Sequence, residues 1–226
     1  LPIGLVAVLG WILTDASFLN LNLYQIVVDI FMPLQNFAQN PFGFVFIMFL
    51  YCFLYSMGIS TWVLTPVVSP IMIAAASANA ELAATGMATN ANLSIFTDAT
   101  VYSAYLWIGG IGCTMPLVIM MLTMAKSQRM KALGKAVLVP AIFNINEPVI
   151  FGTPIVMNPV FFIPFLLAPM VNAVLAWAAM KFDLIGRVIS VVPWTAPAPV
   201  GAAWALGWDF RAAILVLVLA CVSAII

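Results

Sequence analysis

Long apolar runs, separated by shorter segments that mix polar residues, prolines and glycines, dominate the hydropathy pattern of the chain. These runs cover residues 1–14, 42–64, 101–125, 161–179 and 210–226. A helix of about 20 apolar residues crosses the hydrocarbon core of a bilayer. We therefore predict an all-α polytopic membrane protein whose transmembrane helices lie in these runs, the first run being the end of a truncated span.

Residues 23–38 show a different, amphipathic pattern, with apolar side chains recurring at helical spacing. The opposite face carries Gln25, Asp29, Gln35 and Asn36. The segment is too polar to span, so we predict a helix kinked at Pro33 that lies along the membrane surface, although packing on a neighbouring element would produce the same pattern. Residues 1–40 are thus a truncated span plus an amphipathic helix, ahead of a transport region at 41–226.

Two regions, near residues 66–100 and 140–159, interrupt the helical pattern inside otherwise apolar sequence. The second region contains Pro140, Pro148, Pro154 and Pro159. Each proline removes a backbone donor, which excludes a continuous helix. Lipid tolerates broken backbone only where it is buried in protein or lines a cavity. We predict a re-entrant or broken hairpin in each region, both within one membrane domain covering 1–226, and transporters build substrate sites in this way.

The composition agrees with a membrane protein, since 65% of the residues are hydrophobic and 6% are charged, against about 25% charged in soluble domains. A net charge of zero offers no reason to expect a nucleic-acid partner. The chain has no histidine, and no second acidic residue or cysteine lies near Glu147, so we expect no metal site and no cofactor. The cysteines, Cys52, Cys113 and Cys221, are expected to be small core residues.

Four of the seven basic residues fall within the ten-residue segment "KSQRMKALGK". They are Lys126, Arg129, Lys131 and Lys135. Cytoplasmic loops are enriched in Lys and Arg, so the segment is predicted to be a cytoplasmic loop. It is also a candidate docking surface for a partner or an anionic ligand, a role that is compatible with this topology.

The broken region at 140–159 contains one carboxylate, Glu147, with Asn144 and Asn146 beside it and Asn158 beyond. An ionisable side chain at membrane depth costs several kcal/mol, roughly 2.5 or more on insertion scales, so it marks a functional site unless it is otherwise partnered. Three amides and one carboxylate offer both donors and acceptors with little net charge, which suits recognition of sugar hydroxyls. The alternative is that these side chains only satisfy the broken backbone.

Trp194 and Thr195 lie in a further interruption, "VPWTAPAP". An indole ring packs on the apolar face of a sugar while its N–H donates one hydrogen bond. Trp is also common at membrane interfaces, so the role of Trp194 is not decided by its type alone. The remaining tryptophans are expected to be packing or interfacial residues.

The segments "PAIFNINEPVIFGTPIVMNP", "FFIPFLLAPMVNAVLAW" and "VPWTAP", preceded in order by "LYSMGIS" and "GGIG", make a recognisable set. The chain resembles the lactose/cellobiose/chitobiose family of membrane components, enzyme IIC (EIIC), of the bacterial phosphotransferase system. The resemblance implies a multi-pass protein of the bacterial plasma membrane and a homodimer. It also implies that the chain is the C-terminal part of a longer protein.

The resemblance further implies a sugar permease that binds a β-linked disaccharide between re-entrant hairpins. It would present the C6 hydroxyl of the sugar to a cytoplasmic partner, enzyme IIB (EIIB), which carries a phosphocysteine. By resemblance, Glu147 contacts that hydroxyl, Trp194 stacks on the sugar, and the basic segment faces the partner. The predicted substrate-binding residues are Tyr55, Ser60, Asn92, Asn144, Asn146, Glu147, Asn158, Trp194 and Thr195.

One position departs from the family, which often has Gly-Ile-His where this chain has Gly58-Ile59-Ser60. The histidine would share the C6 hydroxyl with the glutamate, so Glu147 is left as the only candidate base. Phosphoryl transfer depends mainly on positioning and charge stabilisation, so this loss need not abolish the reaction.

Two other functions stay open on the residues alone. In an ion- or proton-coupled secondary transporter, Glu147 would carry the coupling proton. A non-transporting membrane subunit is the third possibility, and the missing histidine is the strongest argument for both alternatives.

Overall fold

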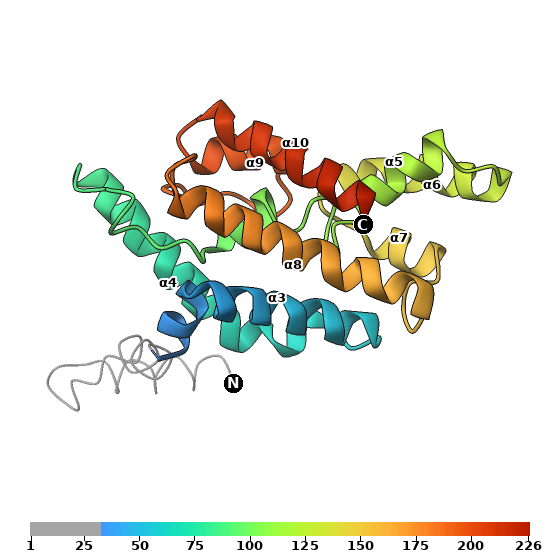
Figure 1. Cartoon of the computed structure of the whole chain (residues 1–226), viewed down its shortest axis with the longest axis horizontal. Coiled ribbons are helices and arrows are strands. Elements are labelled where there is room, and N and C mark those ends of the chain that lie inside the picture. Colours follow the sequence, from blue (N-terminus) through green and yellow to red (C-terminus); the bar gives the residue numbers. More distant parts are fainter. Residues whose placement is uncertain (1–32) are drawn as a thin grey trace, which may run out of the picture.

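The computed structural model describes residues 33–226, and within that range the chain is helical without any strand (Figure 1). A short helix, Pro33–Gln39, comes first. The helices that follow are α3 (Pro41–Ser56), η1 (Thr61–Val63), α4 (Thr65–Ala84), η2 (Ala99–Ala104), α5 (Met115–Thr123), α6 (Gln128–Ile142), α7 (Glu147–Gly152), α8 (Pro159–Lys181), α9 (Ala198–Ala205) and α10 (Phe210–Ile225). The predicted all-α membrane architecture is confirmed. The truncated span at 1–14 and most of the amphipathic helix at 23–38 lie outside the described residues.

Helices α4 and α8 are both long and apolar enough to cross a membrane, and the bent pair formed by Pro33–Gln39 and α3 is a third candidate. The two parts of that pair meet at 97°. Asn40 separates them, and its side chain accepts a hydrogen bond from the backbone N–H of Phe42, which caps the start of α3. The predicted span at 161–179 is confirmed as α8, which continues through Pro164 and Pro169.

Two of the predicted spans are wrong in extent. The run at 42–64 is helical only to Ser56, because Gly58 has a φ of +80° and turns the chain before η1. The run at 101–125 is not one helix. It contains the last four residues of the π-helix η2, a non-helical stretch, and the nine-residue helix α5. Gly109, Gly110 and Gly112 all have positive φ there, which ends helical geometry even though the sequence stays apolar.

The basic segment is not a loop, because α6 begins at Gln128 and includes Arg129, Lys131 and Lys135. Helices α5 and α6 pack against each other as a hairpin, and this hairpin projects at one end of the molecule (Figure 1). Lys126 lies in the short connection between them.

The prolines of the broken region at 140–159 interrupt the helices much as predicted. Helix α6 contains Pro140 near its end and stops at Ile142, α7 is six residues long, and α8 begins at Pro159. In the other region, near 66–100, α4 is continuous to Ala84, so the non-helical backbone is confined to residues 85–98. The re-entrant character of both regions stays a prediction.

Near the C-terminus, the chain is again non-helical before α9, and Asp209 accepts a hydrogen bond from the N–H of Arg211 at the start of α10. Asp209 is therefore the N-cap of α10, a position for which aspartate is one of the favoured residues.

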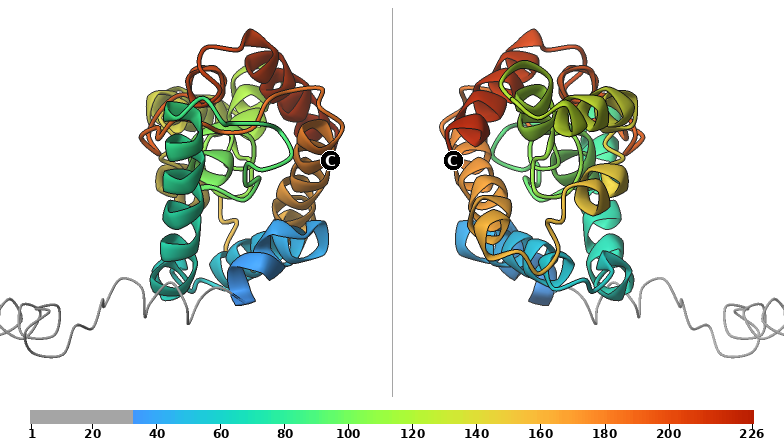
Figure 2. Two further views of the ribbon diagram at one scale, coloured as in Figure 1. Left: turned by 90° about the vertical axis from the view of Figure 1, so that its left-hand side faces the viewer. Right: turned by 90° about the vertical axis from the view of Figure 1, so that its right-hand side faces the viewer.

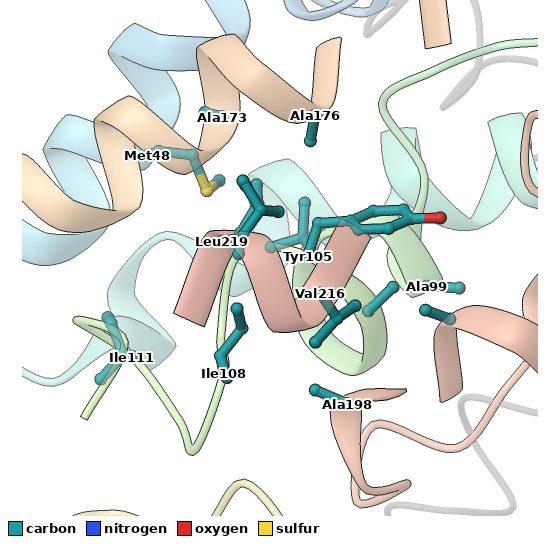
Figure 3. Close-up of a cluster of buried hydrophobic side chains, with 14 of the residues drawn as sticks. Met48, Ala99, Tyr105, Ile108, Ile111, Ala173, Ala176, Ala198, Val216 and Leu219 are labelled. Atoms are coloured by element: carbon teal, nitrogen blue, oxygen red, sulfur yellow. The ribbon is translucent and has the colours of Figure 1, made fainter. Parts of the chain in front are cut away.

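Seen end-on, α4, α3, α8 and α10 surround the segment 99–114, which lies at the centre of the molecule (Figure 2). Figure 3 shows Tyr105, Ile108 and Ile111 of this segment packed among side chains of the surrounding helices. The partners include Met48 of α3, Ala173 and Ala176 of α8, and Val216 and Leu219 of α10. Alanines on α8 let the helices approach the central segment closely. Non-helical backbone therefore occupies the core, where it is shielded from lipid.

The cysteines only partly follow expectation. Cys52 and Cys113 are buried, as predicted, whereas Cys221 is exposed on α10. The prediction was wrong for Cys221 because its position on the helix turns it away from the residues that pack on α8 and α9.

The central glycines support a direct test. A Cβ at Gly112 would overlap the ring of Phe165 on α8, whereas a Cβ at Gly86 meets nothing, although both residues have positive φ. Gly112→Ala should therefore lower the free energy of unfolding by about 1–3 kcal/mol more than Gly86→Ala does, since the backbone strain is common to both. Thermal unfolding in detergent measures the difference, and equal losses in the two variants would contradict the packing assigned to Gly112.

Candidate functional site

Asn144 holds together the segments that surround the predicted site. It lies just after α6 with a φ of +62°, a conformation that asparagine tolerates better than most residues. Its side-chain oxygen accepts from the N–H of Gly109 at 3.1 Å. Its amide nitrogen lies 3.2 Å from the carbonyl oxygen of Tyr102, 3.0 Å from that of Trp194 and 2.9 Å from that of Ala196. The side chain thus bonds the backbone of three parts of the chain, namely the π-helix η2 and the non-helical segments around Gly109 and residues 194–196.

Asn146, two residues after Asn144, also bonds backbone of the central segment through its side chain. Its amide nitrogen donates to the carbonyl of Ile111 at 2.6 Å, and the residue is buried. Gly110 packs so closely on the Asn146 side chain that a Cβ there would overlap it. The backbone of the "GGIG" segment therefore packs directly against the side chain of Asn146, the residue before Glu147.

These contacts favour a structural role for the two asparagines. Both are buried, and the two N–H bonds of the Asn144 amide are already shared among three carbonyls. The alternative interpretation, that the amides satisfy the broken backbone, accounts for the contacts of both residues. Direct contact of Asn144 or Asn146 with a sugar stays a prediction.

Glu147 differs from its neighbours because it is exposed, at the first position of α7. Asn144 and Asn146 fix the backbone on its N-terminal side, while their own polar groups point to protein rather than to the carboxylate. The carboxylate is consequently positioned by a rigid segment and left accessible, which is the arrangement expected of an ionisable group that faces water or a ligand within a membrane protein.

The end of α3 lies against the connection between α7 and α8. The N–H of Met157 donates to the carbonyl of Ser56 at 2.8 Å, and a Cβ added at Gly58 would lie 3.3 Å from the Val156 side chain. This brings the "GIS" segment, with Ser60, to the same side of the molecule as α7. Ser60 is exposed, and its hydroxyl accepts from the N–H of Trp62 at 3.4 Å.

Tyr55, one residue before Ser56, faces the same region. It is half-buried and its ring stacks on Phe165 of α8 at 6.4 Å between centroids.

Trp194 reaches the site through its backbone, since its carbonyl accepts from Asn144. The residue as a whole is 52% exposed, which leaves it accessible to a ligand. Thr195 follows it and is half-buried. The predicted grouping of Glu147, Trp194, Thr195, Tyr55 and Ser60 around one region is compatible with this geometry.

Two predicted residues have other tasks in the structure. The side chain of Asn158 accepts from the N–H of Val160 and caps α8. Asn92 accepts from the N–H of Thr89 and donates to the carbonyl of Met87, which stabilises its own exposed loop. The predicted contacts of these two residues with a sugar stay predictions.

One polar cluster was missed from the sequence. The hydroxyls of Tyr51 on α3 and Tyr102 on η2 lie 3.3 Å apart, and the indole of Trp107 packs edge-on against both rings. Asp98 is half-buried and immediately precedes η2. Burial raises the pKa of the Asp98 carboxyl. We name Tyr51, Tyr102, Trp107 and Asp98 the tyrosine–tryptophan cluster. The available signal was the position of Tyr51, one helical turn before Tyr55.

A cavity of about 170 Å³ lies elsewhere, between α5, α8 and α10. Its lining is mostly apolar, with Thr114, Cys113 and Ser223 as polar members. Glu147, Trp194 and Ser60 do not line it, so this cavity is separate from the site built around Glu147.

Comparison with known proteins identifies the family. The model of the family "Phosphotransferase system, EIIC" matches residues 1–169 of the chain. The chain belongs to this EIIC family. It is therefore part of an integral plasma-membrane protein, in agreement with its apolar helices.

Curated relatives of this EIIC chain include sugar-specific members. It is 42% identical over 117 residues to the cellobiose-specific EIIC component of Lactococcus lactis subsp. lactis, a match that covers 52% of this chain and 24% of the relative. It is 33% identical over 218 residues to the lactose-specific EIICB component of Staphylococcus haemolyticus, covering 95% of this chain and 36% of the relative. The EIIC chain thus spans between about a quarter and about a third of the length of these relatives.

A solved structure has the same fold. The crystal structure of the IIC component of the N,N'-diacetylchitobiose-specific phosphotransferase system matches with a TM-score of 0.83 and 30% sequence identity. The match covers 99% of this chain and 51% of that protein. The suspected family resemblance is confirmed.

The contacts of Asn144 in this EIIC chain predict a stability effect. Asn144→Gly removes the amide but permits the positive φ, so the change isolates the hydrogen bonds. It should lower the free energy of unfolding by about 1–3 kcal/mol, because buried carbonyls lose their donor. Asn92→Gly, which removes the amide of an exposed turn, should change stability by less than about 0.5 kcal/mol.

Thermal unfolding compares the two variants, and hydrogen exchange should speed up at residues 191–197 in Asn144→Gly only. Unchanged exchange in that segment would contradict the role assigned to Asn144.

Proposed function

We propose that the protein containing this chain is a sugar permease of the phosphoenolpyruvate-dependent phosphotransferase system. Its substrate is a β-linked disaccharide of the cellobiose, lactose and chitobiose class, bound beside Glu147. The C6 hydroxyl of the sugar is phosphorylated by the phosphocysteine of a cytoplasmic EIIB partner during uptake. Membership of the EIIC family and the substrates in the relatives' names support the class of substrate.

The observation that carries this proposal is the accessible carboxylate of Glu147 on a rigidly held break in the membrane domain. Asn144 couples this break to the backbone of Trp194, so the carboxylate and an exposed indole belong to one rigid unit. A carboxylate that accepts from a hydroxyl, and an indole that packs on a pyranose face, are complementary to a sugar.

In the proposed reaction, the S–P bond of the phosphocysteine breaks and an O–P bond forms to the C6 oxygen. The hydroxyl proton passes to the carboxylate of Glu147, and the cysteine of the partner leaves as a thiolate. Ser60 replaces the family's histidine in this chain. Its hydroxyl can donate or accept a hydrogen bond but is not a base near neutral pH, so Glu147 acts alone. General base catalysis contributes about 10²–10⁴-fold to such a step.

The α5–α6 hairpin is the proposed docking surface for EIIB. Lys126, Arg129 and Lys135 are exposed on it and Lys131 is half-buried. Residues 115–142 contain no Asp or Glu, so the hairpin presents positive charge alone. The projection of the hairpin from one end of the molecule (Figure 1) leaves it accessible to an acidic surface. Such complementarity raises association rates more than it raises affinity. The predicted homodimer rests on the family resemblance alone.

Binding and product analysis test the function as a whole. The full-length protein is tested against a panel of β-disaccharides by thermal stabilisation, and then for sugar phosphate formation in vesicles with the phosphorylated partner. Uptake that needs the partner and yields sugar phosphate supports the proposal. Uptake that collapses when the proton gradient is dissipated would instead indicate a proton-coupled transporter, and absence of sugar binding would indicate a non-transporting subunit.

Glu147→Gln should abolish phosphorylation, because the amide cannot accept the hydroxyl proton. The affinity for sugar should fall less, since the amide keeps a hydrogen-bonding group in place. Glu81→Gln is the matched control, because Glu81 is an exposed carboxylate on α4 and should leave both properties unchanged. Both variants are assayed for sugar phosphate and for binding. Normal phosphorylation by Glu147→Gln would show that Glu147 is not the base.

Reversal of charge on the hairpin should weaken the encounter with EIIB. In Arg129→Glu combined with Lys135→Glu, the rate of phosphorylation at low partner concentration should fall about tenfold or more, and less so at high salt. The control combines Lys181→Glu with Arg211→Glu. These residues are also exposed, and they lie at the C-terminal end of α8 and the N-terminal end of α10. Sugar affinity, measured separately, should not change in either double variant. An equal loss of rate in the control would refute docking on the hairpin.

A further inference from the structure

An exposed aromatic surface lies where α8 ends and α9 leads into α10, away from the α5–α6 hairpin (Figure 1). Its members are Phe182, Trp204, Trp208 and Phe210. We propose that this aromatic surface, with Lys181 and Arg211 beside it, binds phospholipid headgroups at the membrane boundary opposite to the hairpin. Such an anchor does not depend on the proposed sugar function.

The first observation is the exposure of large aromatic side chains at one place. Phe182 is 74% exposed and Trp208 is 58% exposed, and Trp204 and Phe210 are exposed as well. The rings of Trp204 and Trp208 stack at 6.4 Å between centroids with an interplanar angle of 5°. Grouped apolar surface of this kind marks a site of contact with a protein or a membrane, whereas single exposed apolar residues do not.

The second observation is the backbone that carries Trp208. Gly207 and Trp208 both have a φ of +70°, a conformation that glycine adopts freely and that is a genuine outlier for a bulky side chain. The N–H of Trp208 donates to the carbonyl of Ala203 at 2.7 Å, which closes the end of α9. The turn brings the Trp208 indole back onto Trp204, and strained positions of this kind cluster at functional sites.

The span α8 determines the depth of the aromatic surface. Its 23 residues extend about 34 Å, against roughly 30 Å for the hydrocarbon core of a bilayer. The helix begins at Pro159, shortly after α7, which packs on α6 of the hairpin. Lys181 is its last residue and Phe182 follows directly. The hairpin and Phe182 therefore lie at opposite boundaries of the membrane.

Helix α10 brings the other aromatic residues to the same boundary as Phe182. The amide of Asn172 on α8 donates to the hydroxyl of Ser223 on α10 at 3.0 Å, and the two helices pack along each other. They run antiparallel (Figure 1). The N-terminal end of α10, with Phe210 and Arg211, consequently lies at the C-terminal end of α8.

The chemistry of the surface favours lipid headgroups. Trp is enriched where a membrane meets water, because its ring is apolar while its N–H reaches a polar group. Lys181 and Arg211 are exposed beside the rings and can pair with lipid phosphates, as cationic side chains near helix ends do. Acyl chains alone would leave these cations and the indole N–H groups unpaired, and water alone would leave the rings exposed.

The anchor is joined to the segment that contains Trp194. The N–H groups of Ile189 and Ser190 donate to the carbonyl of Ala205, the residue after Trp204, at 2.9 and 3.1 Å. Contact of the aromatic surface with headgroups would therefore fix the depth in the bilayer of the backbone that leads to Trp194.

Quenching of fluorescence by brominated lipids tests the depth. The full-length protein is reconstituted in phosphatidylcholine vesicles with bromine either near the headgroup or near the chain end. The difference in emission between the wild type and the double variant Trp204→Phe with Trp208→Phe reports the stacked indoles alone. Bromine near the headgroup should quench this difference about twofold more than bromine near the chain end. Trp107→Phe is the control, because the buried Trp107 indole N–H lies in the central segment and its difference should be quenched by neither lipid.

Labelling from one side of the membrane tests the boundary. Lys181→Cys and Lys126→Cys each replace an exposed lysine, one beside the aromatic surface and one on the hairpin. In right-side-out vesicles, a membrane-impermeant maleimide should label Lys181→Cys and leave Lys126→Cys unlabelled, and inside-out vesicles should give the reverse.

Three results would overturn the anchor. These are equal or stronger quenching by the chain-end bromine, labelling of both lysine positions from one side, and no quenching by either lipid. The last is the result expected if a second copy or another protein covers the surface. Sugar phosphate formation is measured separately, so the anchor and the proposed function can fail independently.

Discussion

The hydrogen bonds of Asn144 are the constraint on which the centre of this molecule depends. Non-helical backbone in a membrane domain has no water to satisfy its carbonyls and N–H groups, so side chains must do so. Asn144 accepts from Gly109 and donates toward Tyr102, Trp194 and Ala196, which joins three interrupted segments at one point. The hydrogen bonds of Asn144 therefore fix the backbone near the accessible Glu147 relative to the backbone of the exposed Trp194.

The same device recurs at the other end of the molecule. The Asn79 amide donates to the carbonyls of Ser94 and Val188 and accepts from the N–H of Ser94. Gln39 accepts from the N–H groups of Ile95 and Phe96. Amide side chains suit this work because each supplies donors and an acceptor without charge, and a charged group would be expensive at membrane depth. The carboxylate of Glu147 is therefore not needed to satisfy the broken backbone.

The arrangement links the fold to the proposed function in two directions. Along the central segment, the contacts of Asn144 and Asn146 join the break before Glu147 to the backbone of Tyr102 and Ile111, which supports the proposed position of Glu147. Outside the central segment, the α5–α6 hairpin carries positive charge without any acidic residue, which suits an acidic partner. The proposed sugar site and the proposed docking surface for the partner thus lie on separate elements.

The sequence by itself determined the membrane class, the span at α8, the break around Glu147 and the cap at Asp209, because apolar length, prolines and capping residues act locally. Only the tertiary structure decided that residues 101–125 are broken, since an apolar run has the same composition as a helix or as buried loop. It also decided that Asn144 and Asn146 serve the backbone, and that Trp107 meets Tyr51 and Tyr102. Those outcomes depend on which distant carbonyls and rings come within reach, and that is a property of packing rather than of spacing along the chain.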